Sequence, residues 1–239
     1  TGLPGILMLS SQVDREEPLT LYGPPKLKEY VDTNRRILDM YINYEIIVKT
    51  VEPGVILETE DFVVRAFRLS HTKPCLGYVM QEKDRPGEFH PEKAQELGIP
   101  AGPLWGKLQR GGTVTLSDGR EIMSSDVMGE KRGGRKFAYV TDSLYLPSIA
   151  KEVQHSDLLL CEGMFTSDME ETASEKKHMT AGQAAQIAKD AEVAKLGLLH
   201  YSPRYGDREL RFLLKDARNI FPNTILTKDR MSFEIPLKD

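Results

Sequence analysis

The regular alternation of short apolar strands and helical segments after residue 136 constrains the fold of this chain more than any other feature. Residues 136–143 read Lys-Phe-Ala-Tyr-Val-Thr-Asp-Ser, an apolar run after the Gly133-Gly134 break that is typical of an interior strand. The expected order is then helix 144–153, strand 157–161, helix 180–191, strand 196–199 and helix 208–218. Thr180 followed by Gln183 is a capping-box pattern for the second of these helices. Such alternation predicts a sheet of parallel strands with helices packed on it.

The first half of the chain has a different pattern, in which strands follow one another closely. Helices are expected at 5–13 and 26–41, and strands at 19–22, 45–51, 55–58, 62–69 and 76–79. The strands from residue 45 onward predict an antiparallel meander, and two closing strands are expected at 224–226 and 231–235. An antiparallel first half and an alternating second half together predict an α/β fold of the αββα sandwich type. We expect a single domain over residues 1–239.

Residues 84–112 interrupt this rhythm with many glycines and prolines, so we predict a projecting arm with a short helix at 91–97. A hairpin around an Asp-Gly turn is expected directly after it, at 114–123. The arm carries several basic side chains, and Phe89 and Trp105 are expected to supply flat apolar surfaces. This combination suits the binding of a large anionic partner, but an exposed loop of mixed charge has the same composition. Composition alone leaves both interpretations open.

The overall composition is that of a globular protein with a full core. The chain has 239 residues, of which 40% are hydrophobic, and a net charge of -4, which excludes a uniformly basic nucleic-acid-binding surface. No run approaches the roughly 18 apolar residues of a membrane span, and no charged-then-apolar leader opens the chain. We therefore expect a cytoplasmic protein with no membrane partner. Cys75 and Cys161 lie in apolar contexts, which predicts buried thiols and no disulfide framework.

Side chains that commonly bind metals stand at the edges of the predicted segments. His71, Asp142, Glu162 and His200 follow strands, and His178 directly precedes the 180–191 helix. Imidazole nitrogen and carboxylate oxygen are the usual non-thiolate ligands of zinc, and one aspartate can bridge two metals. The set predicts a carboxylate-bridged zinc site. Two alternatives stay open, because Asp142 could instead cap the next helix and a strand-end histidine is often a structural residue.

Several motifs together resemble the bacterial ribonuclease Z branch of the metallo-β-lactamase superfamily, endonucleases that trim the 3′ end of precursor tRNA. Gly2-Leu3-Pro4-Gly5 is similar to the segment that follows the family's principal metal motif, and Ser70-His71 matches its third motif. The segment 82–104 resembles the Gly-Pro arm with which the family holds the tRNA body. The resemblance covers nearly the whole chain. It implies a metallo-β-lactamase-type sandwich in which residues 84–112 are an inserted, flexible tRNA-binding arm.

The same resemblance implies roles for individual residues. Asp142 would bridge two zinc ions, with His71 on the first and His200 on the second, while Glu162 and His178 would form a catalytic pair for proton transfer to the leaving oxygen. The residues implied to contact RNA are Gly102, Pro103 and Lys107 in the arm, and Ser202 and Arg204 in a segment similar to the family's Thr-His-x-Ser-x-Arg-Tyr. Family members form homodimers in which the arm of one subunit serves the site of the other, so a homodimer is expected.

The chain departs from the family pattern at several positions. Thr141-Asp142-Ser143 replaces Gly-Asp-Thr, Cys161 replaces a histidine, and Met179 replaces a serine. The family's His-x-His-x-Asp-His motif does not occur in residues 1–239. We therefore expect an N-terminally truncated form that lacks the first strands of the sandwich. Each zinc would keep two protein ligands, whereas a zinc site normally has at least three, so weak metal binding and poor cleavage are expected.

The leading hypothesis is a zinc-dependent endonuclease that cleaves the 3′ trailer of precursor tRNA. A hydrolase of small phosphodiesters on the same fold is an alternative, although such an enzyme has no use for a long arm. A second alternative is a non-catalytic tRNA-binding remnant, whose binding would weaken with salt and would not respond to chelators.

Overall fold

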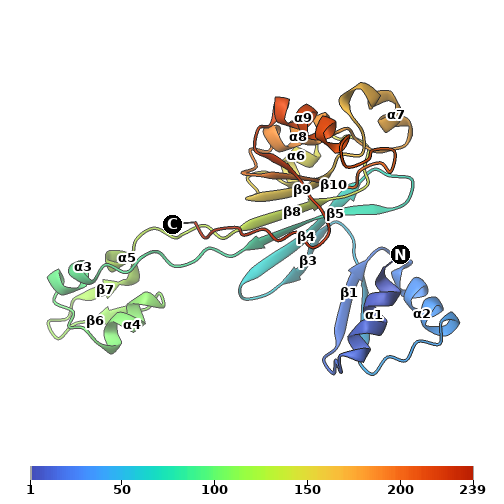
Figure 1. Cartoon of the computed structure of the whole chain (residues 1–239). Helices are drawn as coiled ribbons and strands as arrows, with labels where there is room; N and C mark the ends of the chain where they lie inside the picture. The colour runs from blue at the N-terminus through green and yellow to red at the C-terminus, as the bar shows by residue number, and fades with distance from the viewer. Residues whose placement is uncertain (1, 239) are drawn as a thin grey trace.

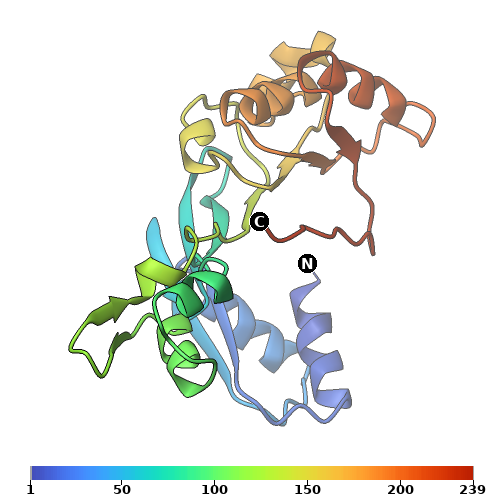
Figure 2. The ribbon, with the colours of Figure 1, turned by 90° about the vertical axis from the view of Figure 1, so that its left-hand side faces the viewer.

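The computed structural model describes residues 2–238. A central sheet is covered by helices on one face, an arm projects from one end of the sheet, and a small N-terminal unit lies beside it (Figure 1). Figure 2, turned by 90°, shows that the arm and the N-terminal unit both lie away from the helical layer. Among the helices of residues 2–238, none combines the length and the apolar character that a membrane span requires.

Seven strands form the central sheet in the order β11-β10-β9-β8-β5-β4-β3. Their bounds are β3 (Gly54–Glu58), β4 (Phe62–Leu69), β5 (Cys75–Glu82), β8 (Lys136–Val140), β9 (Leu158–Glu162), β10 (Leu196–Leu199) and β11 (Thr224–Leu226). The strands β8 to β11 are parallel, whereas β5 is antiparallel to both β8 and β4. The strand β4 therefore points the same way as β8, β9 and β10. The predicted parallel half and the meander of β3, β4 and β5 are confirmed.

Helices cover one face of this sheet: α6 (Ile149–Glu152), α8 (Ala181–Asp190) and α9 (Leu210–Ile220) (Figure 1). A 3₁₀ turn (Ser167–Met169) and α7 (Glu170–Glu175) connect β9 to α8. Ala184, Ala185 and Ala188 on α8 are fully buried, so their small side chains let the helix lie close to Leu159 and Leu198 of the sheet in the shared core. The capping box between Thr180 and Gln183 is present as predicted.

The N-terminal unit has a core of its own. It contains α1 (Leu3–Gln12), β1 (Leu19–Gly23), α2 (Leu27–Ile37) and β2 (Ile46–Thr50). The prediction that residues 45–51 belong to the meander is wrong, because β2 pairs in parallel with β1 and α2 forms the crossover between them. Burial of Leu7, Val31 and Met40 between the helices and this two-stranded sheet stabilises that pairing.

The segment between β5 and β8 forms the arm. It contains α3 (Pro91–Glu96), α4 (Pro103–Gln109), β6 (Thr113–Thr115), β7 (Glu121–Met123) and α5 (Ser124–Val127), so the predicted hairpin is part of the arm's folded unit. Phe89 and Trp105, expected to supply flat apolar surfaces, are partly buried in the arm. Their rings lie 5.2 Å apart against the arm's core, and Trp105 Nε1 donates a hydrogen bond to the carbonyl of Ile99. In a unit this small, the aromatic rings contribute much of the apolar surface that the core buries.

Two further predictions differ from the structure. The helix expected at 144–153 is limited to α6, because Pro147 disfavours the helical conformation of the residue before it. No strand forms at 231–235, where the carbonyl of Ile235 accepts a hydrogen bond from the Arg135 side chain rather than from a neighbouring strand.

Candidate metal and catalytic site

The ends of four strands meet at one edge of the sheet and bring the candidate residues together. Because β4, β8, β9 and β10 point the same way, their carboxyl ends lie at the same edge. His71 and Asp142 follow β4 and β8, Glu162 is the last residue of β9, and His200 directly follows β10. His178, just ahead of α8, has its ring between those of His71 and His200, with centroid distances of 4.8 and 5.3 Å.

The carboxylate of Asp142 lies between two imidazoles. His200 Nδ1 is 3.4 Å from Oδ1, and His71 Nε2 is 3.9 Å from Oδ2. Metal–ligand bonds of 2.0–2.2 Å in a tetrahedral zinc site separate neighbouring donor atoms by about 3.3 Å. The His200 spacing matches this value, and the His71 spacing is about 0.6 Å longer, so a small approach of His71 would complete a bridging carboxylate. The helix-capping alternative for Asp142 is wrong, since α6 starts at Ile149 and its N-cap residue is Ser148.

Neighbouring groups hold Asp142 in its ionised form. Burial by itself would raise the pKa of this carboxyl group, but a 2.8 Å hydrogen bond from the Thr141 hydroxyl and the charges of His200 and His71 outweigh it and lower the pKa. Asp142 therefore carries its negative charge at neutral pH, as a ligand of a cation must.

The rings of His71 and His200 are oriented by the backbone. His71 Nδ1 donates a hydrogen bond to the carbonyl of Lys177, 2.9 Å away, so Nε2 is the ring nitrogen that faces Asp142 and would bind a metal in the neutral imidazole. His200 has a φ of 58°, a left-handed conformation that is uncommon for a residue with a Cβ and often marks a functional site. The carboxylate of Glu162, 4.0 Å from Nδ1, raises the pKa of His200, and Asp142 adds to this effect against the opposing effect of burial.

Glu162 and His178 form a second, deeper pair. Glu162 is fully buried, and both of its oxygens lie 3.1 Å from His178 Nδ1. The backbone N–H of Ser143 donates to Oε1 at 2.5 Å, and that of Met179 donates to Oε2 at 3.4 Å. An ionised carboxylate can only accept, so Nδ1 of His178 carries the proton. Within residues 2–238, Glu162, His178 and His200 also bring three possible ligand atoms to within 4.8 Å of one another.

Sequence patterns identified Thr141 and Ser143 only as departures from a family motif. Thr141 fixes the Asp142 carboxylate, whereas Ser143 joins two strand ends, since its hydroxyl accepts from the N–H of Ser70 and its own N–H donates to Glu162. The sequence signal for these two roles was the pair of hydroxyl side chains that flank Asp142. Cys161 and Met179, two other residues that differ from the family pattern, are in contact. The Cys161 thiol lies 3.7 Å from the Met179 sulfur, and both residues are fully buried.

The residues with implied RNA contacts occupy two separate places. Ser202 and Arg204 follow His200 near the site, where the Arg204 guanidinium lies 5.0 Å from the centre of the Phe165 ring. Gly102 and Pro103 begin α4 in the arm, and Lys107 lies in the same helix. The structure therefore does not bring these arm residues to the site of their own chain (Figure 1).

Comparisons with known proteins identify the fold. Residues 113–201 match the family model described as Beta-lactamase superfamily domain. The short form of human tRNase Z is similar in structure, with a TM-score of 0.62 at 21% sequence identity, over 98% of this chain and 74% of that chain. The helix-covered sheet, the family model and this structural neighbour thus define a protein of the metallo-β-lactamase fold.

Relatives in sequence define the family more narrowly. The ribonuclease Z of Treponema denticola is 64% identical over 240 residues, which cover 100% of this chain and 78% of that protein. The ribonuclease Z of Treponema pallidum (strain Nichols) is 57% identical, over 100% of this chain and 77% of that protein. The chain belongs to the ribonuclease Z family of endoribonucleases.

Proposed function

We propose that this protein is a zinc-dependent endonuclease that cleaves the 3′ trailer from precursor tRNA. One observation carries the proposal: two carboxylates and three imidazoles converge at one sheet edge, in a chain that is 64% identical over its full length to a protein named ribonuclease Z. We also propose that the activity is cytoplasmic, as expected from the sequence.

The donor atoms around Asp142 fit a pair of zinc ions. His71 and Asp142 would hold one ion, and Asp142 and His200 the other, in line with their spacings. Bound zinc would polarise the scissile phosphate and lower the pKa of a water molecule. A polypeptide of residues 1–239 alone supplies two ligands to each ion, so we expect it to bind zinc weakly.

Glu162 is better suited to orient His178 than to bind a metal. Its two oxygens already accept hydrogen bonds from the backbone N–H groups of Ser143 and Met179 and from His178 Nδ1. Glu162 would thereby fix the orientation of the His178 ring through Nδ1. The other ring nitrogen, Nε2, would deliver the proton to the oxygen that leaves when the phosphodiester bond breaks.

RNA would be held by two groups of residues. Ser202 and Arg204 stand beside the catalytic edge, and the exposed Arg204 guanidinium suits a phosphate. Gly102, Pro103 and Lys107 would contact the body of the tRNA through the arm. We propose that the inserted segment 84–112, together with the hairpin that packs on it, is the tRNA-binding arm.

A homodimer would place an arm at each site. The arm leaves the sheet at the end of β5 and returns at the start of β8, at the sheet edge opposite the one that carries the site. Strand residues rise about 3.3 Å each, so even the five-residue β8 separates the two edges by roughly 16 Å, and the chain's own arm projects away from its site. The arm of a partner subunit would serve the site instead.

The proposed dimer contact is the outer surface of the N-terminal unit. Large apolar side chains are exposed there: Ile6, Leu9, Val13, Ile37, Leu38 and Tyr41. A concentration of this kind is typical of protein–protein contacts. Sedimentation equilibrium at micromolar concentration measures the oligomeric state, and a monomer under these conditions would refute the dimer.

The test of function uses two histidines with matched backbones. His200 and His155 both have positive φ, of 58° and 55°, but His155 is a surface residue that faces Glu192. Asparagine tolerates this conformation, so neither substitution by asparagine strains the backbone. We expect His200→Asn to abolish zinc-dependent release of the trailer from a labelled precursor tRNA, and His155→Asn to leave it unchanged.

The same assay separates the alternatives. We expect the polypeptide of residues 1–239 to cut slowly, and to cut faster when it is extended at its N-terminus by residues that carry the family's His-x-His-x-Asp-His motif. An extended protein without endonuclease activity contradicts the proposal. Hydrolysis of small phosphodiesters by an extended protein that cleaves no precursor tRNA, with a rate unchanged by deletion of residues 84–110, favours the small-substrate hydrolase. Salt-sensitive tRNA binding without cleavage, and without response to chelators, favours the binding remnant.

A further inference from the structure

The arm is joined to the sheet by a narrow stalk, formed by residues 83–88 and 129–135. Its two chains exchange hydrogen bonds between Arg85 and Arg132, and they approach so closely at Gly134 that a Cβ there would lie 2.1 Å from the carbonyl oxygen of Glu82. A two-stranded ribbon of this kind is only marginally stable by itself. Something outside the ribbon must therefore hold its direction.

Residues 231–238, which we call the tail, lie along the base of this stalk and contact both of its chains (Figure 1). Arg85 Nη2 donates to the carbonyl of Lys238 at 2.5 Å, and Arg135 Nη1 donates to that of Ile235 at 3.3 Å. The ammonium group of Lys238 donates to the carbonyl of Gly134 at 3.3 Å. Both chains of the stalk are thus hydrogen-bonded to the tail.

The tail is in turn anchored to the sheet. The Lys238 ammonium lies 3.0 Å from Oδ1 of Asp157, which directly precedes β9. The other oxygen of Asp157 accepts a hydrogen bond from the N–H of Lys136, the first residue of β8, at 2.6 Å. One carboxylate therefore links the tail, the end of the stalk and the central sheet.

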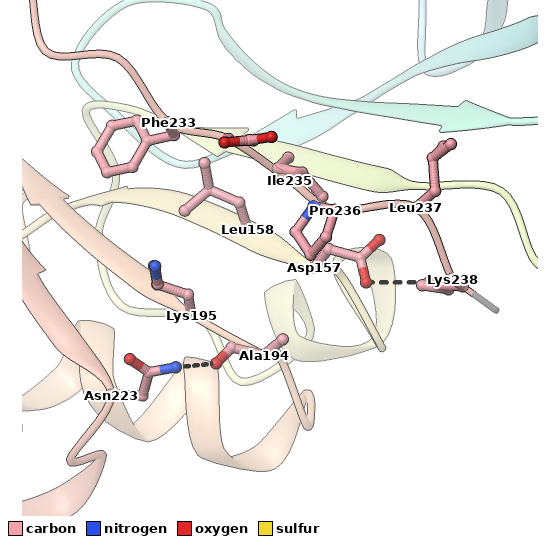
Figure 3. A pocket seen from close by; sticks show the side chains of 11 residues that line it. Asp157, Leu158, Ala194, Lys195, Asn223, Phe233, Ile235, Pro236, Leu237 and Lys238 are labelled. Carbon is pink, nitrogen blue, oxygen red and sulfur yellow. Dashed lines mark hydrogen bonds and ion pairs between the residues drawn. The ribbon is translucent and has the colours of Figure 1, made fainter.

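Packing of the tail on the sheet is incomplete, because Phe233 and Ile235 are only half-buried and Leu237 is exposed. A cavity of about 220 Å³ separates the tail from the sheet edge, and Leu158, Lys195 and Phe233 are among the residues that line it (Figure 3). The tail spans this cavity and is held by polar contacts, most of them near Lys238. Figure 3 shows one of these, the ion pair between Lys238 and Asp157. Loss of those contacts would release it from the stalk.

We propose that the tail is a strap that fixes the direction of the arm, with Asp157 and Lys238 as positioning residues for tRNA binding. The inference rests on the proposed function, because it assigns the arm to tRNA. A ligand that binds one arrangement of a protein has an apparent affinity reduced by the fraction of molecules in that arrangement. If release of the strap leaves about one tenth of the arms correctly directed, the dissociation constant for precursor tRNA rises about tenfold.

The variant Asp157→Asn separates the strap from simple electrostatics. It removes the ion pair with Lys238 but keeps an oxygen for the N–H of Lys136. Loss of one negative charge should by itself strengthen RNA binding, whereas release of the strap should weaken it. The matched control is Glu234→Gln, which removes one charge from an exposed side chain of the tail itself.

Three measurements on the full chain decide the matter: the dissociation constant for precursor tRNA, amide hydrogen exchange, and hydrolysis of bis(p-nitrophenyl) phosphate. For Asp157→Asn we expect about tenfold weaker tRNA binding and faster exchange at Arg85 and Arg132, with the small-substrate rate equal to that of the parent. Glu234→Gln should match the parent in exchange and bind tRNA at least as tightly. Unchanged or tighter tRNA binding by Asp157→Asn overturns the proposal. If the parent binds no tRNA, the proposed function fails, and the exchange rates alone decide whether the strap exists.

Discussion

Replacement of Glu162 by glutamine tests the buried catalytic pair most directly. Each oxygen of the carboxylate accepts a backbone hydrogen bond, Oε1 from the N–H of Ser143 and Oε2 from that of Met179. His178 Nδ1 donates to both oxygens. A glutamine of the same shape must turn its NH₂ group toward one of these donors. The longer contact, 3.4 Å from Met179 N, accommodates it with less repulsion.

The expected cost follows from the burial of the site. Glu162 is fully buried, so a donor that loses its acceptor there also has no water to bind. One buried unsatisfied group costs about 1–3 kcal/mol, which for a protein of this size corresponds to a decrease in melting temperature of roughly 2–12 °C. His178 also loses its anionic partner, and we expect cleavage of precursor tRNA to slow about 10²-fold, since general acid catalysis contributes about 10²–10⁴-fold.

The assay is thermal unfolding followed by circular dichroism, together with the cleavage rate of a labelled precursor tRNA. The control is Glu170→Gln, because Glu170 is exposed and its bond from Gln183 Nε2 can be kept by the amide oxygen. We expect the control to change stability by less than about 0.5 kcal/mol. A Glu162→Gln protein that melts and cleaves like the parent would refute the assignment of these hydrogen bonds.

Three other predictions concern different parts of the molecule. Thr141→Val, which removes the hydroxyl bound to Asp142, should weaken zinc binding by about 10–100-fold in competition with a chromophoric chelator, and Thr141→Ser should restore it; equal affinities for all three proteins would contradict this role. Hydrogen bonds from Arg135 lower the pKa of Glu82 from 4.5 to about 2, so this pair stabilises the fold above pH 4.5 and its contribution is lost as the pH falls to 2. The stability difference between the parent and Glu82→Gln should therefore shrink across that window in pH-dependent melts, and a constant difference would refute the linkage. Leu108→Ala should cost the arm's separate core about 2–5 kcal/mol, so hydrogen exchange should accelerate in the arm and not in the central sheet; uniform acceleration would show that the arm does not unfold independently.

Local patterns predicted the elements that lie next to one another along the chain. The hydrophobic periods predicted β8, β9 and β10, the capping box predicted the start of α8, and the meander of β3, β4 and β5 needed only short turns. The grouping of His71, Asp142 and His200 could also be expected, because residues at the carboxyl ends of strands that run the same way share one edge of the sheet.

Local sequence patterns could not predict contacts between distant segments of the chain. The hydrophobic period of β2 predicts a strand but does not reveal whether its partner is β1 or β3. Burial of the N-terminal core decided that β2 pairs with β1. Composition likewise could not predict that Trp105 packs partly buried against the arm's core, since the same ring suits RNA or an apolar core. The donors around Glu162 come from loops 17 and 19 residues away along the chain.

The sequence by itself determined the strands of the central sheet, most of its helical layer and the types of side chain at the strand ends, because hydrophobic periodicity and strand-end side chains are properties of neighbouring residues. Only the tertiary structure decided which carboxylate is buried against backbone N–H groups, which is held between imidazoles, and how the tail meets the stalk. These features depend on the distances between atoms of remote segments, and those distances exist only once the whole chain has packed.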